Sequence, residues 1–409
     1  MKILQVNKFF YVRGGASRYF FEVSKLLQSY GHEIAYFSMK DPNNQKSEWS
    51  KYFVSNISFE KVALKQFPRI VSRMFYSIEA RRNISKLLDG FKPDIAHLHS
   101  IYHHLSPSII YELSKRNIPI VQTLHDYHLI SPNHTLYHDG EICEITKQKK
   151  YYKAILHKCV KGSSLAGVIE VIEQYTHLLL GINNKVNIFI SPSNFHAKKL
   201  VEYGIPKEKI EVLHNFCDYR EFEPHYKLGD YMLYFGRLSP EKGLDFLIVV
   251  MRRLSKVRLR IAGTGLEEDK LKTLVERLKL KNVEFVGYQS GEALKRLIYQ
   301  SRFTVLPSKC YENFPISVLE AFACGKPVIG SKIGGTPELI QNNYNGFLFK
   351  LGNGEDCMEK INKLWNNHLL CRKIGRNAKE YLEKNFGPEE HYDKLMEIYN
   401  KAIAFYKGY

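Results

Sequence analysis

Residues 231–254, YMLYFGRLSPEKGLDFLIVVMRRL, read as a strand, a loop and a helix in succession. The apolar run is rich in aromatic residues and stops at Gly236, so that Arg237 enters a loop, and residues 239–254 then follow a helical pattern. Arg237 and Lys242 are therefore expected at the carboxyl end of a strand, where open α/β sheets bind their ligands. Two fixed cations there can neutralise a diphosphate, although the same residues also fit ordinary surface charges.

A second stretch, residues 308–325 with the sequence SKCYENFPISVLEAFACG, predicts a helix with carboxylates near its start. Pro315 suits the first helical position, because its fixed φ and its missing N–H are harmless there. Gly325 suits the left-handed position that ends a helix. Glu312 then precedes the helix, and Glu320 lies within it.

This helix is expected to begin between Asn313 and Ile316, where its free N–H groups and positive dipole end can receive a phosphate. Glu312 can accept hydrogen bonds from sugar hydroxyls on one side of a diphosphate, and Glu320 from ribose hydroxyls on the other. Taken alone, the spacing also fits a loop acid and a solvated helix residue. Combined with the two cations of the first stretch, it favours a nucleotide-sugar site.

Strand and helix patterns alternate along the chain and predict an α/β protein with parallel, doubly wound sheets. The first set of expected strands is KILQVN, HEIAYFS, PDIAHLHS, IPIVQTLHD, NIFISPS and KIEVLHN, and the second is YMLYFGRL, VRLRIAG, NVEFVG, RFTVLPS, PVIGS and GFLFK. The charged, non-periodic residues 217–230 between them read as a linker. Since 409 residues exceed what one core usually serves, we expect two Rossmann-like domains facing a cleft.

In combination, GRLSPEKG (residues 236–243) and ENFPISVLE (residues 312–320) resemble the signature of the family 4 retaining glycosyltransferases, which have the GT-B fold. MKILQVNKFFYVRGGASRYFFEVSKLL, IPIVQTLHD, GGTPELI and NNYNGFLF are similar to further motifs of that family. The resemblance implies an N-terminal acceptor-binding domain at residues 1–216 and a C-terminal nucleotide-sugar-binding domain at residues 217–386. A C-terminal helix at residues 387–409 is expected to pack back on the first domain.

The resemblance also implies a retaining, metal-independent transferase that needs no cofactor. It would move a sugar from a UDP- or GDP-sugar to a hydroxyl of a cell-surface glycan or lipid-linked acceptor. A nucleotide-sugar epimerase of the same fold and a noncatalytic basic binding protein remain alternatives. The pair of motifs GRLSPEKG and ENFPISVLE argues against the epimerase.

Candidate site residues follow from these motifs and from the position of each residue after a strand. The expected catalytic residues are Arg237, Lys242, Glu312 and His125. Donor contacts are expected from Gly15, Gly263, Gly265, Gly287, Tyr288, Asn313, Phe314, Pro315, Ile316 and Glu320, and acceptor contacts from Gly14, Arg18, His99 and Asp126. The glycines let a backbone approach phosphate or acceptor, although a glycine pair also fits a tight turn.

Histidines are dense between residues 97 and 138, which raises the question of a metal site. In the family, the residue that matches His125 contacts the donor sugar, and Asp126 could fix its tautomer by a hydrogen bond. A satisfied buried histidine is the alternative. His97 and His99 share one face of a strand, yet no Asp or Cys follows at the spacing of a closed zinc site. We therefore expect acceptor contacts and core packing here, and no metal.

The net charge of +18 implies an anionic partner. No nucleic-acid-binding module is recognisable, and a lipid-diphosphate-linked glycan would explain the charge. Between residues 61 and 86, apolar residues recur at helical spacing among lysines and arginines, which fits docking on anionic lipid or a helix packed on the sheet.

The chain has no apolar run of transmembrane length and begins directly with a strand. Its seven cysteines fit free thiols in a reducing compartment. We therefore expect a cytoplasmic protein, with peripheral association at the inner face of the plasma membrane as an open alternative.

Overall fold

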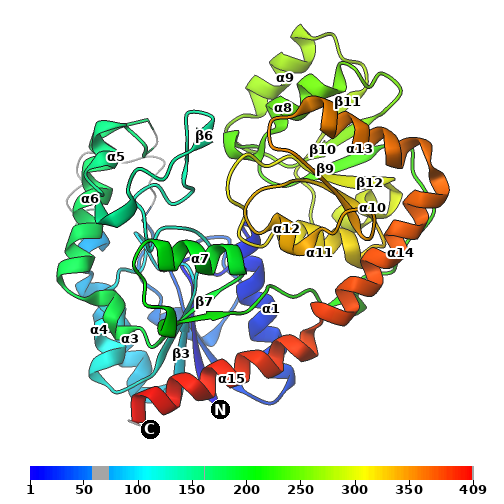
Figure 1. Cartoon of the computed structure of the whole chain (residues 1–409). Helices are drawn as coiled ribbons and strands as arrows, with labels where there is room; N and C mark the ends of the chain where they lie inside the picture. Colours follow the sequence, from blue (N-terminus) through cyan, green and yellow to red (C-terminus); the bar gives the residue numbers. More distant parts are fainter. Residues whose placement is uncertain (58–72, 161, 408–409) are drawn as a thin grey trace. The chain divides into compact units, whose positions relative to one another are not determined.

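The computed structural model describes residues 1–57, 73–160 and 162–407 and contains two compact units. The first unit comprises Met1–Thr135, Glu144–Leu213 and Tyr392–Tyr409, and the second comprises Leu136–Cys143 and His214–His391. Each unit is a parallel sheet with helices packed against it (Figure 1). The predicted α/β class with two doubly wound sheets is confirmed.

The sheet of the first unit has six parallel strands in the order β2-β1-β3-β4-β7-β8. Their bounds are Lys2–Val6 (β1), Glu33–Phe37 (β2), Ile95–Leu98 (β3), Ile120–Thr123 (β4), Ile188–Ser191 (β7) and Ile210–Val212 (β8). The inner strands β3, β4 and β7 are buried along their whole length, as expected when helices cover both faces. These are the six strands that the apolar runs predict.

The helices of the first unit connect these strands and cover the sheet (Figure 1). They are α1 (Gly15–Ser29), α3 (Ile78–Phe91), α4 (Ser108–Lys115), α5 (Lys153–Leu156), α6 (Ser164–Leu179) and α7 (Asn194–Glu202). A short hairpin of β5 (Tyr137–His138) and β6 (Glu141–Ile142) interrupts this unit in sequence and groups with the second one.

The last helix, α15 (Pro388–Lys407), belongs to the first unit from Tyr392 onward (red in Figure 1). The Tyr399 hydroxyl lies 2.7 Å from Nδ1 of His97 on β3, and the Tyr392 ring stacks on Tyr30 with centroids 3.6 Å apart. The predicted return of the C-terminal helix to the N-terminal domain is therefore confirmed.

The second unit repeats the architecture with the strand order β11-β10-β9-β12-β13-β14. Its strands are Met232–Phe235 (β9), Leu259–Ala262 (β10), Val283–Gly287 (β11), Phe303–Leu306 (β12), Val328–Ser331 (β13) and Gly346–Phe349 (β14). Its helices are α8 (Leu244–Met251), α9 (Glu268–Arg277), α10 (Gly291–Gln300), α11 (Ile316–Ala323), α12 (Thr336–Leu339), α13 (Gly354–Asn366) and α14 (His368–Asn385). Along β9, Met232 and Tyr234 join one core cluster, whereas Leu233 and Phe235 join another, because successive side chains point to opposite faces.

The helix predicted at residues 239–254 is interrupted at Gly243. A 3-10 turn, η7, covers Pro240–Lys242, and α8 begins only at Leu244. Gly243 has a φ of 69°, and a Cβ atom there would lie 2.0 Å from the Pro307 carbonyl oxygen. The left-handed glycine therefore separates two segments that sequence periodicity had joined.

Two sequence expectations concern the connecting segments. The predicted linker, residues 217–230, contains one 3-10 turn, η6 (Tyr219–Glu221), and lies wholly within the second unit. Residues 61–72 of the predicted basic amphipathic segment lie outside the described residues. Within the described part, Arg73 is buried and paired with Glu79, which fits packing against the protein.

Two helical glycines should respond to alanine with opposite signs. In α3, nothing lies within 4 Å of a Cβ atom placed on Gly90, so Gly90→Ala should stabilise the protein by up to about 1 kcal/mol through helix propensity. In α14, a Cβ on Gly375 would lie 2.3 Å from the Gly325 carbonyl oxygen, so Gly375→Ala should destabilise by about 1–3 kcal/mol. Urea unfolding of the two variants measures this. Equal stabilisation of both would contradict the close approach of α14 to the end of α11.

Candidate functional site

The strand order of the second unit reverses between β9 and β12, and the loops after these two strands bring Lys242 and Glu312 together. The Lys242 ammonium donates to Oε1 of Glu312 at 2.6 Å. The Ser308 hydroxyl donates to the same oxygen. No hydrogen bond within the described residues uses Oε2 of Glu312, so that oxygen can still accept from a ligand. A sheet's reversal point is where doubly wound folds bind ligands.

The Lys242–Glu312 pair is largely shielded from water, with 21% and 10% of the two side chains exposed. Burial alone would lower the pKa of Lys242, but the Glu312 carboxylate outweighs it and raises that pKa. Lys242 is therefore a permanent cation at neutral pH. A cation fixed in a poorly hydrated place stabilises a developing phosphate charge more strongly than one in bulk water.

Arg237, the other predicted cation, differs from Lys242 because 65% of its side chain is exposed. Its guanidinium donates to Oε1 of Glu241 at 2.6 Å, and the Ser239 hydroxyl donates to the same oxygen at 2.7 Å. The Tyr234 hydroxyl holds the Arg237 carbonyl at 2.8 Å. The backbone of Arg237 is thus fixed, while its side chain can reach outward to a ligand.

Helix α11 begins at Ile316, with Pro315 as its N-cap rather than its first helical residue. Pro315 was expected at the first helical position, but it lies one residue before the helix. Its ψ of 114° is that of extended backbone and not of a helix. At the other end, Gly325 has a φ of 68°, and the N–H groups of Gly325 and Lys326 bond to the carbonyls of Phe322 and Ala321. The predicted glycine stop is therefore confirmed.

The remaining predicted donor contacts at this helix differ in what each residue can offer to a ligand. Glu320 lies within α11 and is 6% exposed. Oδ1 of Asn313 is buried without a hydrogen-bond partner, so the amide at the helix start has an unused acceptor. In contrast, the Phe314 ring belongs to a core cluster and stacks on His214, which leaves only the backbone of Phe314 for a ligand.

The glycines of the second unit bring neighbouring loops together at the carboxyl edge of the sheet. A Cβ atom on Gly263 would lie 1.8 Å from the Gly236 carbonyl oxygen, and one on Gly265 would lie 2.1 Å from that of Leu238. Loop packing therefore already requires both glycines, and the expected close approach of a diphosphate to them stays a prediction. Gly287 has a φ of 69° and open space around it, and the adjacent Tyr288 is exposed.

Sequence reasoning did not assign a role to the loop of Gly334 and Gly335, although it quoted their motif GGTPELI. The Gly335 N–H donates to the Glu312 carbonyl at 2.6 Å. A Cβ on Gly334 would lie 2.5 Å from the same carbonyl oxygen. The two glycines thus support the backbone of Glu312 from behind.

In the first unit, His125 follows β4 and lies beside His99, which follows β3. Nδ1 of His99 lies 3.2 Å from Nε2 of His125, and Nε2 of His99 lies 2.8 Å from the Gln5 amide oxygen. Burial lowers the pKa of His125 to about 4, so its imidazole is neutral at pH 7. A neutral ring offers a hydrogen bond rather than a charge.

Two roles predicted beside His125 differ in the structure. His99 is only 1% exposed and both its ring nitrogens have partners, so it supports His125 and cannot reach an acceptor directly. Asp126 was expected to orient His125, but its Oδ1 accepts from the backbone N–H of His128 at 3.0 Å. The ring nitrogen of His99 occupies the position expected for that carboxylate.

Gly14 and Gly15 are exposed at the start of α1, and nothing lies within 4 Å of a Cβ placed on Gly14. Ser17 holds this start: its hydroxyl accepts from the backbone N–H groups of Arg13 and Gly14 and donates to the Gly14 carbonyl. Arg18 lies half-buried on the next turn of α1. Ser17 was not predicted, although a serine three residues after a helix-capping glycine is a recognisable signal.

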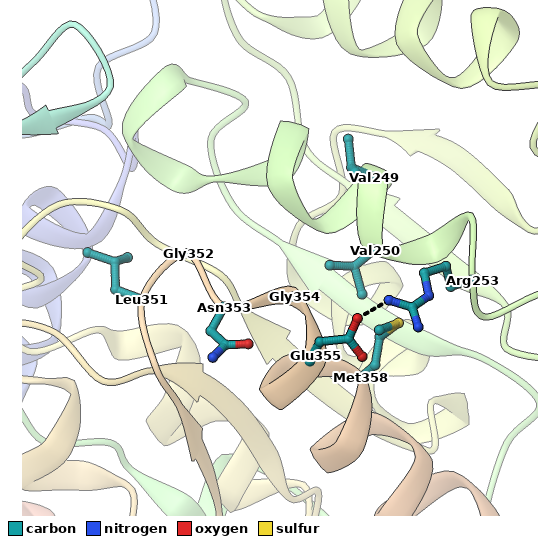
Figure 2. Close-up of a pocket in the computed structure, with 9 residues that line it drawn as sticks. All are labelled: Val249, Val250, Arg253, Leu351, Gly352, Asn353, Gly354, Glu355 and Met358. Atoms are coloured by element: carbon teal, nitrogen blue, oxygen red, sulfur yellow. Dashed lines mark hydrogen bonds and ion pairs between the residues drawn. The ribbon is translucent and has the colours of Figure 1, made fainter.

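A pocket of about 510 Å³ lies elsewhere in the second unit, between α8 and the start of α13 (Figure 2). Val249, Val250, Met358 and Leu351 line it, together with the ion pair of Arg253 and Glu355. None of the predicted site residues is among its lining residues. We therefore place the candidate site at the carboxyl edge of the sheet and not in this pocket.

Two Rossmann-like units of this kind make up the GT-B fold, and solved structures share it. A sucrose-phosphate synthase from Thermosynechococcus elongatus superposes with a TM-score of 0.75 at 17% identity, covering 98% of this chain and 99% of that one. The HepE protein of Anabaena, solved with UDP and glucose, has a TM-score of 0.68 at 19% identity, covering 97% and 99%.

The chain belongs to Glycosyltransferase Family 4, because the sequence model of that family matches residues 13–221. Residues 217–381 match the model of the Glycosyl transferases group 1 family. An uncharacterized glycosyltransferase of Methanocaldococcus jannaschii is 24% identical over 94% of both chains. The N-acetyl-alpha-D-glucosaminyl L-malate synthase of Bacillus anthracis is 24% identical over 95% of this chain and 94% of that one. These matches favour neither the epimerase nor the noncatalytic binding protein.

Proposed function

We propose that this glycosyltransferase takes its sugar from a nucleoside-diphosphate donor and transfers it, with retention, to a hydroxyl of a glycan or lipid-linked acceptor. The buried Lys242–Glu312 pair at the strand reversal of the second unit carries the proposal. It combines a permanent cation for the diphosphate with a carboxylate oxygen for the sugar hydroxyls. The UDP-bound HepE structures and the N-acetylglucosaminyl transferases among the relatives support a UDP-sugar first.

The other candidate residues of the second unit have proposed roles in binding the donor and in stabilising the charge of the leaving diphosphate. As the glycosidic bond to phosphate breaks, negative charge grows on the leaving diphosphate. Lys242 and Arg237 stabilise that charge together with the N–H groups at the start of α11. Glu320 binds the ribose, and residues 217–386 form the donor domain.

The acceptor side of the proposal rests on the first unit, residues 1–216 with the helix at 387–409. Neutral His125, held by His99, which in turn contacts Gln5, can hydrogen-bond the transferred sugar without adding charge. The open space at Gly14 admits an acceptor close to the backbone of α1. Among the described residues, no helix combines the length and the apolar character needed to cross a membrane. Peripheral binding to anionic lipid remains a prediction.

Incubation with a panel of UDP- and GDP-sugars tests the function. We expect thermal stabilisation by one nucleoside diphosphate, and release of that nucleotide from its sugar donor when a hydroxyl acceptor is supplied. Proton NMR of the product should show the anomeric configuration of the donor. Absence of stabilisation by both UDP and GDP would remove the donor proposal, and an inverted product would remove retention.

We also propose that transfer needs no metal ion, because two protein cations and a helix start take the place of a cation at the diphosphate. Turnover measured well below the unfolding temperature should be nearly the same with and without EDTA. Loss of turnover that Mg²⁺ or Mn²⁺ restores would contradict this. The nucleotide-release assay used for the donor panel gives the measurement.

A further inference from the structure

A buried cluster of two histidines and two glutamates lies in the first unit, apart from the candidate transfer site. His103 follows β3, His128 follows β4, and Glu170 and Glu173 lie one turn apart on α6. One nitrogen or oxygen from each of these residues falls within 4.8 Å of the others. Nε2 of His103 lies 3.0 Å from Oε2 of Glu170 and 3.0 Å from Oε2 of Glu173.

The cluster contains polar atoms whose hydrogen-bonding capacity is unused. Nε2 of His128 is buried without a hydrogen-bond partner, and His128 is 3% exposed. Oε1 of Glu173 is also buried without a hydrogen bond, and Glu173 has no exposed surface. A buried polar group normally finds a partner, because leaving it unsatisfied costs about 1–3 kcal/mol. Two such atoms from different elements point to a missing ligand between them.

The backbone holds these side chains in place. The His128 N–H donates to Asp126, and the His128 carbonyl accepts from the Gln174 side chain of α6. His103 adopts a φ of 65°, which is unusual for a residue other than glycine and places its ring toward α6. Positioning of this kind is what a ligand site needs before its ligand arrives.

We propose that His103, His128, Glu170 and Glu173 bind a divalent transition-metal ion, with Zn²⁺ as the fitting probe. Imidazole nitrogens and carboxylate oxygens are ligands of Zn²⁺, at about 2.0–2.2 Å. Tetrahedral ligands at that distance lie about 3.4 Å from one another, so the 3.0 Å contacts already match and the 4.8 Å limit requires only small side-chain rotations. Two carboxylates and two neutral imidazoles would balance a charge of +2.

A proton is the competing occupant of this site. Oε2 of each carboxylate lies 3.0 Å from Nε2 of His103, so an empty cluster can hold a proton between the ring and the two acids. That arrangement leaves His128 Nε2 without a partner. A metal ion would use the His128 nitrogen as a ligand.

The ion would serve as a structural cross-link. Its ligands come from two loops at the carboxyl edge of the first sheet and from α6, which is separated from His103 by 67 positions. Joining such distant segments stabilises the folded state, because an unfolded chain has no preformed site. No metal was expected from the sequence because neither Asp nor Cys follows His97 and His99 at the spacing of a closed zinc site, whereas α6 supplies carboxylates from far along the chain.

Zinc binding to untagged protein, stripped of metal by chelation, tests the proposal. We expect one equivalent of Zn²⁺ per chain with a Kd below about 1 μM, and a rise of several degrees in Tm. Glu173→Gln and His128→Gln should each weaken binding at least tenfold. The matched controls Glu208→Gln and His157→Gln, at exposed sites of the same unit, should leave it unchanged.

Co²⁺ substitution tests the wild-type chain directly and keeps the proposal testable if a variant does not fold. A nitrogen and oxygen site of four or five ligands gives visible d–d bands without the intense ultraviolet charge-transfer band of a thiolate. Failure to bind a stoichiometric ion would overturn the proposal, as would a thiolate band that identifies a cysteine such as Cys143 as the ligand. Binding unaffected by both substitutions would do so too.

Discussion

Replacing Lys242 with alanine should lower turnover by roughly a hundredfold or more, since it removes a fixed cation from the shielded site proposed for the leaving diphosphate. The same substitution leaves Glu312 without its ion-pair partner, so a negative charge would face the donor phosphates. Arg237→Ala should also lower turnover by about a hundredfold, although its side chain is 65% exposed and contributes little to folding. Initial rates of nucleotide release at saturating donor measure both effects.

Matched variants separate this effect from a general loss of charge. Lys360 is as shielded as Lys242 and pairs with Asp356, and Arg258 is as exposed as Arg237 and pairs with Asp230. Alanine at Lys360 or Arg258 should change turnover less than twofold. Near wild-type turnover for both Lys242→Ala and Arg237→Ala would refute their assignment to the diphosphate.

Glu312 and Glu320 should give different losses when each is replaced by glutamine. Glu320→Gln should weaken the intact donor and the free nucleoside diphosphate alike, because both contain the ribose. Glu312→Gln should keep or strengthen affinity for the nucleoside diphosphate, because Lys242 loses a competing carboxylate. Turnover should nevertheless fall by a factor of about 10²–10³ if contacts with the reacting sugar are lost.

Calorimetric titration of both variants with UDP and GDP, alongside turnover, makes the comparison. Glutamine keeps the size of each side chain, so folding is disturbed less than by alanine. Equal losses of nucleoside-diphosphate affinity in the two variants would contradict the division between ribose and transferred sugar. The same titration of Glu338→Gln, a half-buried acid paired with His214, provides a control within the same unit.

The strands and their division between two domains could be predicted from the sequence, because buried parallel strands are short continuous apolar runs. Each run such as MLYF in β9 is bounded by a glycine or a polar loop. The placement of Lys242 and Glu312 at one sheet edge also follows from sequence, since both residues come after strands. Their direct contact could not be predicted, because it depends on β9 and β12 being neighbours.

Contacts between distant segments account for the other differences. Periodicity treated residues 239–254 as one helix, but the packing of Gly243 against Pro307 divides it. Asp126 is adjacent to His125 in sequence, yet the partner of the His125 ring is His99 on the neighbouring strand's loop. In each case the deciding neighbour lies far away in the chain, where local pattern carries no signal.

The carboxylates that already hold Lys242 and Arg237 have a consequence for the end of the catalytic cycle. With the nucleoside-diphosphate donor proposed above, the spent nucleotide would compete with Glu312 and Glu241 for the same cations, and these acids are tethered and never diffuse away. They would act as built-in displacing groups that limit how long the spent nucleotide stays bound. Inhibition by the released nucleoside diphosphate should therefore be weaker than it would be if Lys242, Arg237 and the start of α11 bound it without these two carboxylates.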